Sequence, residues 1–143
     1  MSSSAAIPLP AGTALAGLCG AAGMLAAGAL GAGDVEQGEI VFQKCYACHS
    51  VVPGAGGLAR PNLSGVVGRS VAGTPDFDYS AALERLPAQG YRVWTELALD
   101  TFLRSPGDFA SGTAMTVVGL ADPDERADVI AYLAAPRHGG AEE

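Results

Sequence analysis

At 143 residues, the chain has room for one domain of ordinary size. A net charge of −7, from fifteen acidic and eight basic residues, argues against nucleic-acid binding, because phosphate contacts need clustered Lys and Arg. Every Asp, Glu, Lys and Arg follows residue 33, so the chain divides into an uncharged segment, 1–33, and an ordinary charged sequence, 34–143.

Residues 1–33 are predicted to be an export leader or an N-terminal membrane anchor. The run from 11 to 33 is uncharged, and Ala27-Gly28-Ala29 offers an A-x-A cleavage site, although the usual basic n-region is missing. The run is just long enough to span a bilayer, but its glycines and alanines would make a poor spanning helix. Cleavage is therefore the favoured interpretation. Either outcome places residues 34–143 outside the cytoplasm.

Asp34 is predicted to cap a short helix that runs through Cys45, with Gln37 as its capping-box partner. The candidate core positions of this helix are Val35, Val41 and Phe42. Gly38 lowers helix propensity, so we expect a packing reason for a glycine at this position.

Directly after this helix comes the motif Cys45-Tyr46-Ala47-Cys48-His49. Two thiols three positions apart, followed at once by an imidazole, are typical of covalent haem attachment. The cysteines would add to the haem vinyl groups, and His49 would be the proximal iron ligand. A closed zinc site would need four ligands, and outside this motif the chain has only Cys19 and His138. A thioredoxin-like dithiol would need a βαβ pattern, which the sequence does not show. Both alternatives are disfavoured.

The segment 50–69 is predicted to be loop, because it contains five glycines and two prolines, and 75–79 is predicted to be a turn. Thr95 is expected to cap a helix over 96–104, ended by Pro106, and 105–119 is expected to be irregular. The apolar character of that helix comes from Leu97, Phe102 and Leu103.

The run Asp122-Pro123-Asp124-Glu125 predicts the start of a last helix, with a capping residue followed by proline at the first position. This helix should run to about Ala134, with Val129, Ile130 and Leu133 as its apolar residues, before Pro136 ends it. Three main helices, long loops and no alternating strands predict a small all-α domain. A doubly tethered haem would stabilise such a loop-rich chain.

The sixth iron ligand would decide how a haem is used, because a second protein ligand favours electron transfer over ligand binding. Met115 is the only methionine after residue 33, and it follows Gly112-Thr113-Ala114 in an irregular loop. His138, in the Gly-rich tail, is the competing candidate. A thioether ligand stabilises ferrous iron and raises the reduction potential relative to a second imidazole.

Over residues 34–135 the sequence resembles the class I c-type cytochromes. The resemblance implies the small cytochrome c fold, with long loops wrapped around one haem c bound through Cys45 and Cys48. It also implies that Gly38 and Phe42 pack against the last helix, with Tyr132 near Gly38. The carbonyl of Pro61 would accept a hydrogen bond from His49 and fix the orientation of the imidazole.

The resemblance further implies which side chains contact the rest of the haem. Arg69, Tyr79 and Trp94 match the propionate contacts, and these side chains carry suitable donors. The Met-side loop matches at Phe102, Pro106, Gly112, Thr113 and Met115. The sequence departs from the family around 87–90, where extra residues suggest a surface loop. It also lacks the lysine ring that many relatives carry around the haem edge.

The resemblance implies a periplasmic, monomeric single-haem electron carrier with His49 and Met115 as axial ligands, and not an enzyme. Its partners would be redox proteins: a quinol-oxidising cytochrome complex, an oxidase, a reaction centre or a dehydrogenase. Membrane association would require that residues 1–33 be retained. Two alternatives stay open, a dedicated haem subunit of a larger redox enzyme and a haem domain that binds small ligands.

Overall fold

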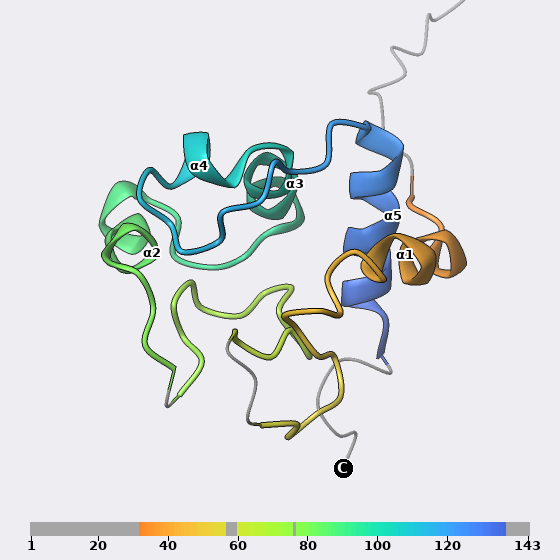
Figure 1. Cartoon of the computed structure of the whole chain (residues 1–143), viewed down its shortest axis with the longest axis horizontal. Coiled ribbons are helices and arrows are strands. Elements are labelled where there is room, and N and C mark those ends of the chain that lie inside the picture. Colours follow the sequence, from red (N-terminus) through yellow and green to blue (C-terminus); the bar gives the residue numbers. More distant parts are fainter. Residues whose placement is uncertain (1–31, 57–59, 76, 137–143) are drawn as a thin grey trace, which may run out of the picture.

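The computed structural model describes residues 32–56, 60–75 and 77–136 (Figure 1). The predicted leader or anchor lies outside the described residues except for its last two positions, and His138 lies outside them too. Within the described ranges, no helix has the length and apolar character needed to cross a membrane.

The regular structure of the described residues is helical, as predicted (Figure 1). The elements are α1 (Val35–Phe42), α2 (Ala81–Arg85), the 3₁₀ helix η1 (Leu86–Gln89), α3 (Glu96–Arg104), α4 (Pro106–Phe109) and α5 (Pro123–Ala134). α3 and α5 have the predicted bounds, and α1 ends three residues before Cys45. Extended pairing in these ranges is limited to one isolated antiparallel bridge, between Ser70 and Val93.

Three short helices were not predicted. η1 covers most of the segment around 87–90, where a surface loop was expected, and α2 precedes it in a segment for which no element was predicted. The expectation that 105–119 is irregular is wrong at its start, because Pro106 opens α4 as well as following α3. Proline is tolerated at the first position of a helix, where its missing N–H would have no partner in any case.

The start of α1 is capped by Asp34, as predicted, but the capping box is wrong. The Asp34 carboxylate accepts hydrogen bonds from the backbone N–H of Glu36 at 2.8 Å and of Gln37 at 3.0 Å. The backbone N–H of Asp34 does not bond back to the Gln37 side chain. It donates instead to the Asp128 carboxylate in α5, at 2.7 Å. The predicted local bond to Gln37 is therefore absent, and the Asp34 N–H instead joins the start of α1 to α5.

α1 packs across α5 (Figure 1), and Gly38 is a point of α1 that lies against the α5 backbone. A Cβ atom at this position would overlap the backbone carbonyl of Asp128 and lie 2.7 Å from the Cβ of Tyr132. The packing reason expected for this glycine, and the expected approach of Tyr132, are therefore both present. Phe42, one turn later, has no exposed surface.

The interior is formed where α1, α3 and α5 meet. Its most buried members on these helices include Phe42, Ala98, Leu99, Phe102, Val129, Ile130, Tyr132 and Leu133. Leu97 was expected to contribute to the apolar face of α3, but its side chain is 66% exposed, and Leu99 is buried in its place. Phe102 is buried as expected, so the prediction for the buried side of α3 is wrong only at Leu97.

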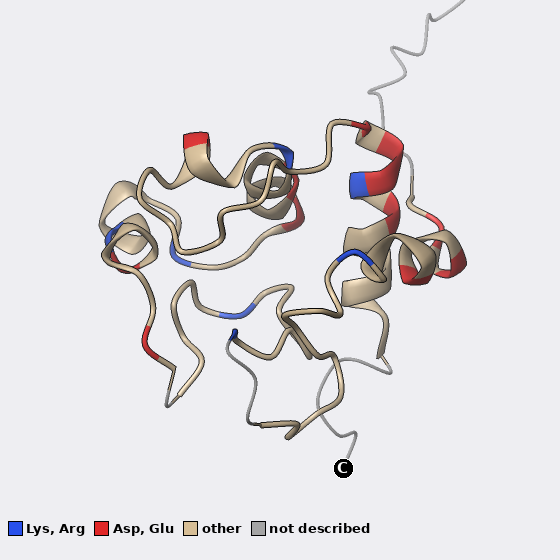
Figure 2. Cartoon of the chain, viewed as in Figure 1, with Lys and Arg blue, Asp and Glu red and all other residues tan. Residues whose placement is uncertain are grey.

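Charge is unevenly distributed over the domain (Figure 2). Acidic residues gather on α1 and at the start of α5, together with their capping residues. They are Asp34, Glu36, Glu39, Asp122, Asp124, Glu125 and Asp128. We call this set the acidic face. Lys44 pairs with Glu125 at its edge, at 2.6 Å.

Candidate functional site

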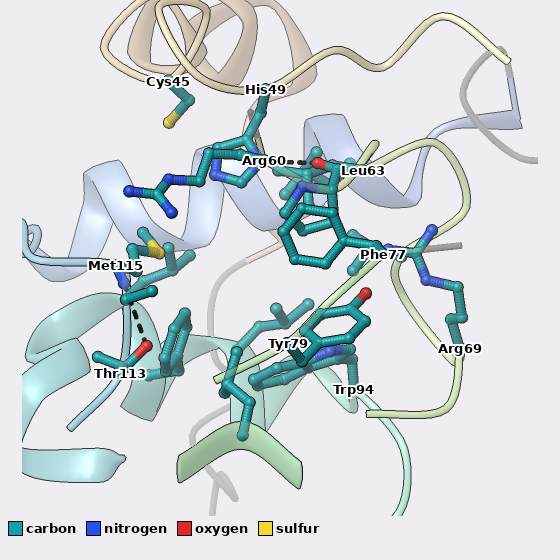
Figure 3. A pocket seen from close by; sticks show the side chains of 18 of the residues that line it. Cys45, His49, Arg60, Leu63, Arg69, Phe77, Tyr79, Trp94, Thr113 and Met115 are labelled. Carbon is teal, nitrogen blue, oxygen red and sulfur yellow. Dashed lines mark hydrogen bonds between the residues drawn. The ribbon is translucent and has the colours of Figure 1, made fainter. Parts of the chain in front are cut away.

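A pocket lies between α1, α3, α5 and the loops that connect the helices (Figure 3). The predicted site residues that line it are Cys45, His49, Pro61, Arg69, Tyr79, Trp94, Thr113 and Met115. Cys48 is exposed and is not among the lining residues, and neither motif cysteine is part of a disulfide.

The motif of residues 45–49 is positioned at the pocket by a turn of the backbone that follows α1. The backbone N–H groups of Cys48 and His49 both bond to the carbonyl of Cys45, at 3.0 and 2.9 Å. This turn directs Cys45 and His49 into the pocket while Cys48 faces outward. Burial raises the pKa of the Cys45 thiol, with the nearby Lys44 charge opposing the shift.

The His49 imidazole is held by a hydrogen bond between its Nδ1 and the backbone carbonyl of Pro61, at 2.8 Å (Figure 3). A carbonyl can only accept, so Nδ1 carries the proton, and Nε2 of the neutral ring keeps its lone pair. Burial lowers the pKa of His49, and the Arg60 charge acts in the same direction, against the Pro61 hydrogen bond. The neutral ring, which is the form that ligates metals, is therefore favoured.

The loop that carries Pro61 is fixed from two sides. The Asn62 side-chain amide donates to the carbonyls of Val52 at 2.7 Å and Ala55 at 3.1 Å. The Arg69 guanidinium donates to the carbonyls of Asn62 at 3.0 Å and Ser64 at 3.1 Å. The carbonyl that orients His49 therefore belongs to a braced segment of backbone.

Polar groups gather on the wall that carries Arg69, Tyr79 and Trp94. The backbone N–H of Trp94 bonds to the Arg69 carbonyl at 2.8 Å, which brings these residues together. Burial lowers the pKa of Arg69, and Tyr79 opposes this shift. The Arg69 Nε and the Ser80 hydroxyl are buried in this wall without a hydrogen-bond partner. Buried donors of this kind normally have an acceptor, so the wall fits a ligand that carries carboxylates.

Met115 approaches the pocket from a different segment, the loop after α4 (Figure 3). Its backbone N–H donates to the hydroxyl of Thr113 at 3.2 Å, and Thr113, only 8% exposed, donates its own N–H to Ala110 at 2.9 Å. The thioether is a soft ligand that suits a transition metal. The fold thus brings a neutral imidazole and a thioether, 66 positions apart in the sequence (49 to 115), into one pocket.

The remaining walls are mainly apolar, formed by Phe42, Leu63, Val66, Leu99, Phe102, Val129 and Leu133 among others. The residues present therefore fit a haem. Apolar side chains line most of the space, the candidate ligands His49 and Met115 enter it, the Cys45 thiol lines it, and donors without a hydrogen-bond partner lie in one wall.

Sequence reasoning missed several residues of the site. Arg60, next to Pro61, extends its guanidinium into the pocket, and no motif or periodicity indicated this (Figure 3). Phe77 lines the pocket with its ring 4.8 Å from that of Tyr79. Ser80 was assigned no role. Leu99 could have been found, because it lies three positions from Phe102 on the same face of α3.

Known proteins are similar to this chain in sequence and in fold. The sequence profile of the family described as Cytochrome c matches residues 35–135. Cytochrome c2 of Agrobacterium tumefaciens (strain II Chrys) is 40% identical over 101 residues, which cover 71% of this chain and 90% of that protein. Cytochrome c2 of Rhodomicrobium vannielii is 41% identical over 122 residues, covering 85% of this chain and 94% of that protein.

Among solved structures, that of cytochrome c2 from Rhodospirillum centenum matches with a TM-score of 0.64 and 38% identity, over 71% of this chain and 96% of that one. The cytochrome c family, to which these relatives belong, binds haem c covalently and transfers electrons to and from redox protein partners. With its motif, its fold and these relatives in agreement, the chain belongs to the cytochrome c family as a class I c-type cytochrome.

Proposed function

We propose that the domain is a single-haem electron carrier in which His49 and Met115 would ligate the iron and Cys45 and Cys48 would attach the haem. The observation that carries this proposal is the hydrogen bond from His49 to the Pro61 carbonyl, in a pocket that Cys45 and Met115 also line. Haem c, when bound, supplies an iron that alternates between the ferrous and ferric states.

The two ligand side chains are positioned by contacts that do not involve a metal. The Pro61 carbonyl fixes the ring of His49, and Thr113 fixes the backbone of Met115. Ligands held in this way need not move when the charge on the metal changes. A neutral thioether favours the lower oxidation state, so Met115 is expected to raise the reduction potential.

The other pocket residues exclude water and receive the acidic edge of the cofactor. The unpaired Arg69 Nε and Ser80 hydroxyl are free to donate to propionates, and Tyr79, Trp94 and Thr113 complete the polar contacts in this proposal. The Trp94 ring also packs against Phe102, with 5.1 Å between the ring centroids, and this contact adds an apolar surface to the same part of the pocket.

We further propose that the domain acts in the periplasm or an equivalent compartment, as a monomer that exchanges electrons with redox proteins. The uncharged segment 1–33, with its A-x-A site, supports export. Candidate partners are a quinol-oxidising complex, an oxidase, a reaction centre or a dehydrogenase.

Mass spectrometry of protein matured together with a c-type assembly system tests the attachment. The wild type should carry the mass of one haem that acidic organic solvent does not remove, and Cys45→Ala and Cys48→Ala should each lose the doubly attached product. Cys19→Ala, a cysteine outside the motif, is the matched control and should keep it. A colourless wild type, or one whose motif thiols can still be alkylated, would reject the proposal.

Carbon monoxide separates an electron carrier from a haem domain that binds small ligands. The reduced wild type should bind CO slowly, because Met115 has to leave first. Rapid binding would favour the alternative function. Tight co-purification with one enzyme would instead identify a dedicated subunit.

A further inference from the structure

Arg126 is a buried cation that the haem site does not use. It lies in α5 with only 6% of its surface exposed. Its Nε donates to the Asp100 carboxylate in α3 at 2.6 Å, and its Nη1 donates to the backbone carbonyls of Leu120 at 2.8 Å and Ala121 at 2.9 Å. One guanidinium therefore joins α3, α5 and the chain that leaves the Met115 loop.

The same end of that loop is held closely against α3. Gly119 has a φ of +94°, and a Cβ atom there would overlap the carbonyl of Arg104 and lie 2.8 Å from that of Leu103. The next backbone N–H, of Leu120, donates to the Leu103 carbonyl at 2.8 Å. Leu120 itself lines the haem pocket, so this attachment point lies at the site.

Met115 thus lies on a segment that is fixed at both ends. Thr113 holds the beginning through its bonds to Met115 and Ala110, and the Leu120–Ala121 carbonyls, held by Arg126, fix the end. The three residues between Met115 and Gly119 are exposed, and Val118 is 97% exposed. Solvent can therefore reach this segment, and its order depends on the two ends.

We propose that Arg126 is a positioning residue for Met115, which it acts on by fixing the exit of the Met115 loop. This inference rests on the proposed ligation by His49 and Met115. A thioether is a neutral ligand that external ligands can displace whenever its loop opens. The Met115 thioether stays bound for longer when its loop opens less often. How often the loop opens is set by the contacts that hold its two ends. Lysine cannot replace arginine here, because one ammonium does not reproduce the planar fork that serves three acceptors.

The test compares Arg126→Lys with the wild-type holoprotein. Cyanide should bind the ferric variant about tenfold faster, the factor expected for loss of one hydrogen bond from a charged donor. The deep-red absorption band that arises from thioether ligation of ferric haem should weaken. Hydrogen exchange at the Leu120 amide should accelerate. Gly119→Ala, which strains the same loop exit without touching Arg126, should give the same three changes.

Ile130→Ala is the matched control, because Ile130 is buried in α5, one turn beyond Arg126, and does not line the pocket. It should lower global stability in denaturant without accelerating cyanide binding. The inference is overturned if cyanide binding accelerates equally in Ile130→Ala at matched stability, or if Arg126→Lys binds cyanide at the wild-type rate. A wild type that lacks the deep-red band and binds cyanide rapidly would reject the proposed Met115 ligation, and this inference with it. A wild type that has the band, together with an Arg126→Lys variant that binds cyanide at the wild-type rate, would reject this inference alone.

Discussion

Gly38 in α1 and Tyr132 in α5 meet with no room for a side chain between them. A Cβ atom at position 38 would lie 2.7 Å from the Tyr132 Cβ and would overlap the Asp128 carbonyl. Phe42, one turn further along α1, also packs against Tyr132, with a tilted ring whose centroid lies 5.4 Å from that of Tyr132. The crossing of the two helices therefore depends on a hydrogen atom at one position.

Gly38→Ala should destabilise the domain by about 1–3 kcal/mol, the range for overpacking a well-filled core. Urea unfolding measures the change. Gly107→Ala is the control, because Gly107 is helical, has open space around it and should shift stability by less than about 0.5 kcal/mol. Equal effects of the two substitutions would contradict the packing argument.

Met115→Ala should lower the midpoint potential and allow the reduced protein to bind CO rapidly, because the proposed thioether ligand is lost. Redox titration and stopped-flow CO binding measure these effects. Thr116→Ala, at the exposed neighbouring position, should leave both unchanged. A potential that does not change in Met115→Ala would exclude Met115 as a ligand.

Asp34→Ala should lower the free energy of unfolding by about 1 kcal/mol, because the carboxylate that caps α1 is lost. The backbone bond from residue 34 to Asp128 does not need this side chain and should persist. Glu39→Ala, an exposed change within the same helix, serves as the comparison in the same thermal or urea experiment. No difference between the two variants would mean that the cap does not stabilise α1.

Electron transfer with a positively charged redox partner should slow several-fold as ionic strength rises from ~0.01 to ~0.15 M, because the chain carries a net charge of −7 and salt shortens the Debye length from ~30 to ~8 Å. Stopped-flow reduction at several salt concentrations measures this. An uncharged small reductant is the control and should react at a constant rate. Rates with the charged partner that stay flat or rise with salt would show that charge does not steer the encounter.

The sequence allowed the three longer helices and the main site residues to be predicted, because each has a local signal. Caps, prolines and apolar spacing marked α3 and α5, and the cysteine motif marked His49. The resemblance then supplied Pro61, Arg69 and Trp94, and the structure places all three at the pocket.

Features that depend on distant contacts could not be predicted in this way. The Asp34 N–H bonds to Asp128, 94 positions away, and not to Gln37 nearby. Arg60 and Arg126 look like ordinary surface charges in the sequence, yet one enters the pocket and the other is buried among three acceptors. Leu97 and Leu99 have similar hydrophobicity, so only the tertiary packing of α3 distinguishes the exposed from the buried one.

The pairing of α1 with α5 also has a consequence for biosynthesis. A ribosome must deliver almost the whole domain before the first helix can find its partner, since 94 positions separate Asp34 from Asp128. Long-range closure of this kind is entropically slow. A nascent or translocating polypeptide that has not yet delivered α5 therefore leaves Phe42 uncovered, and its final shape is reached only once synthesis is nearly finished.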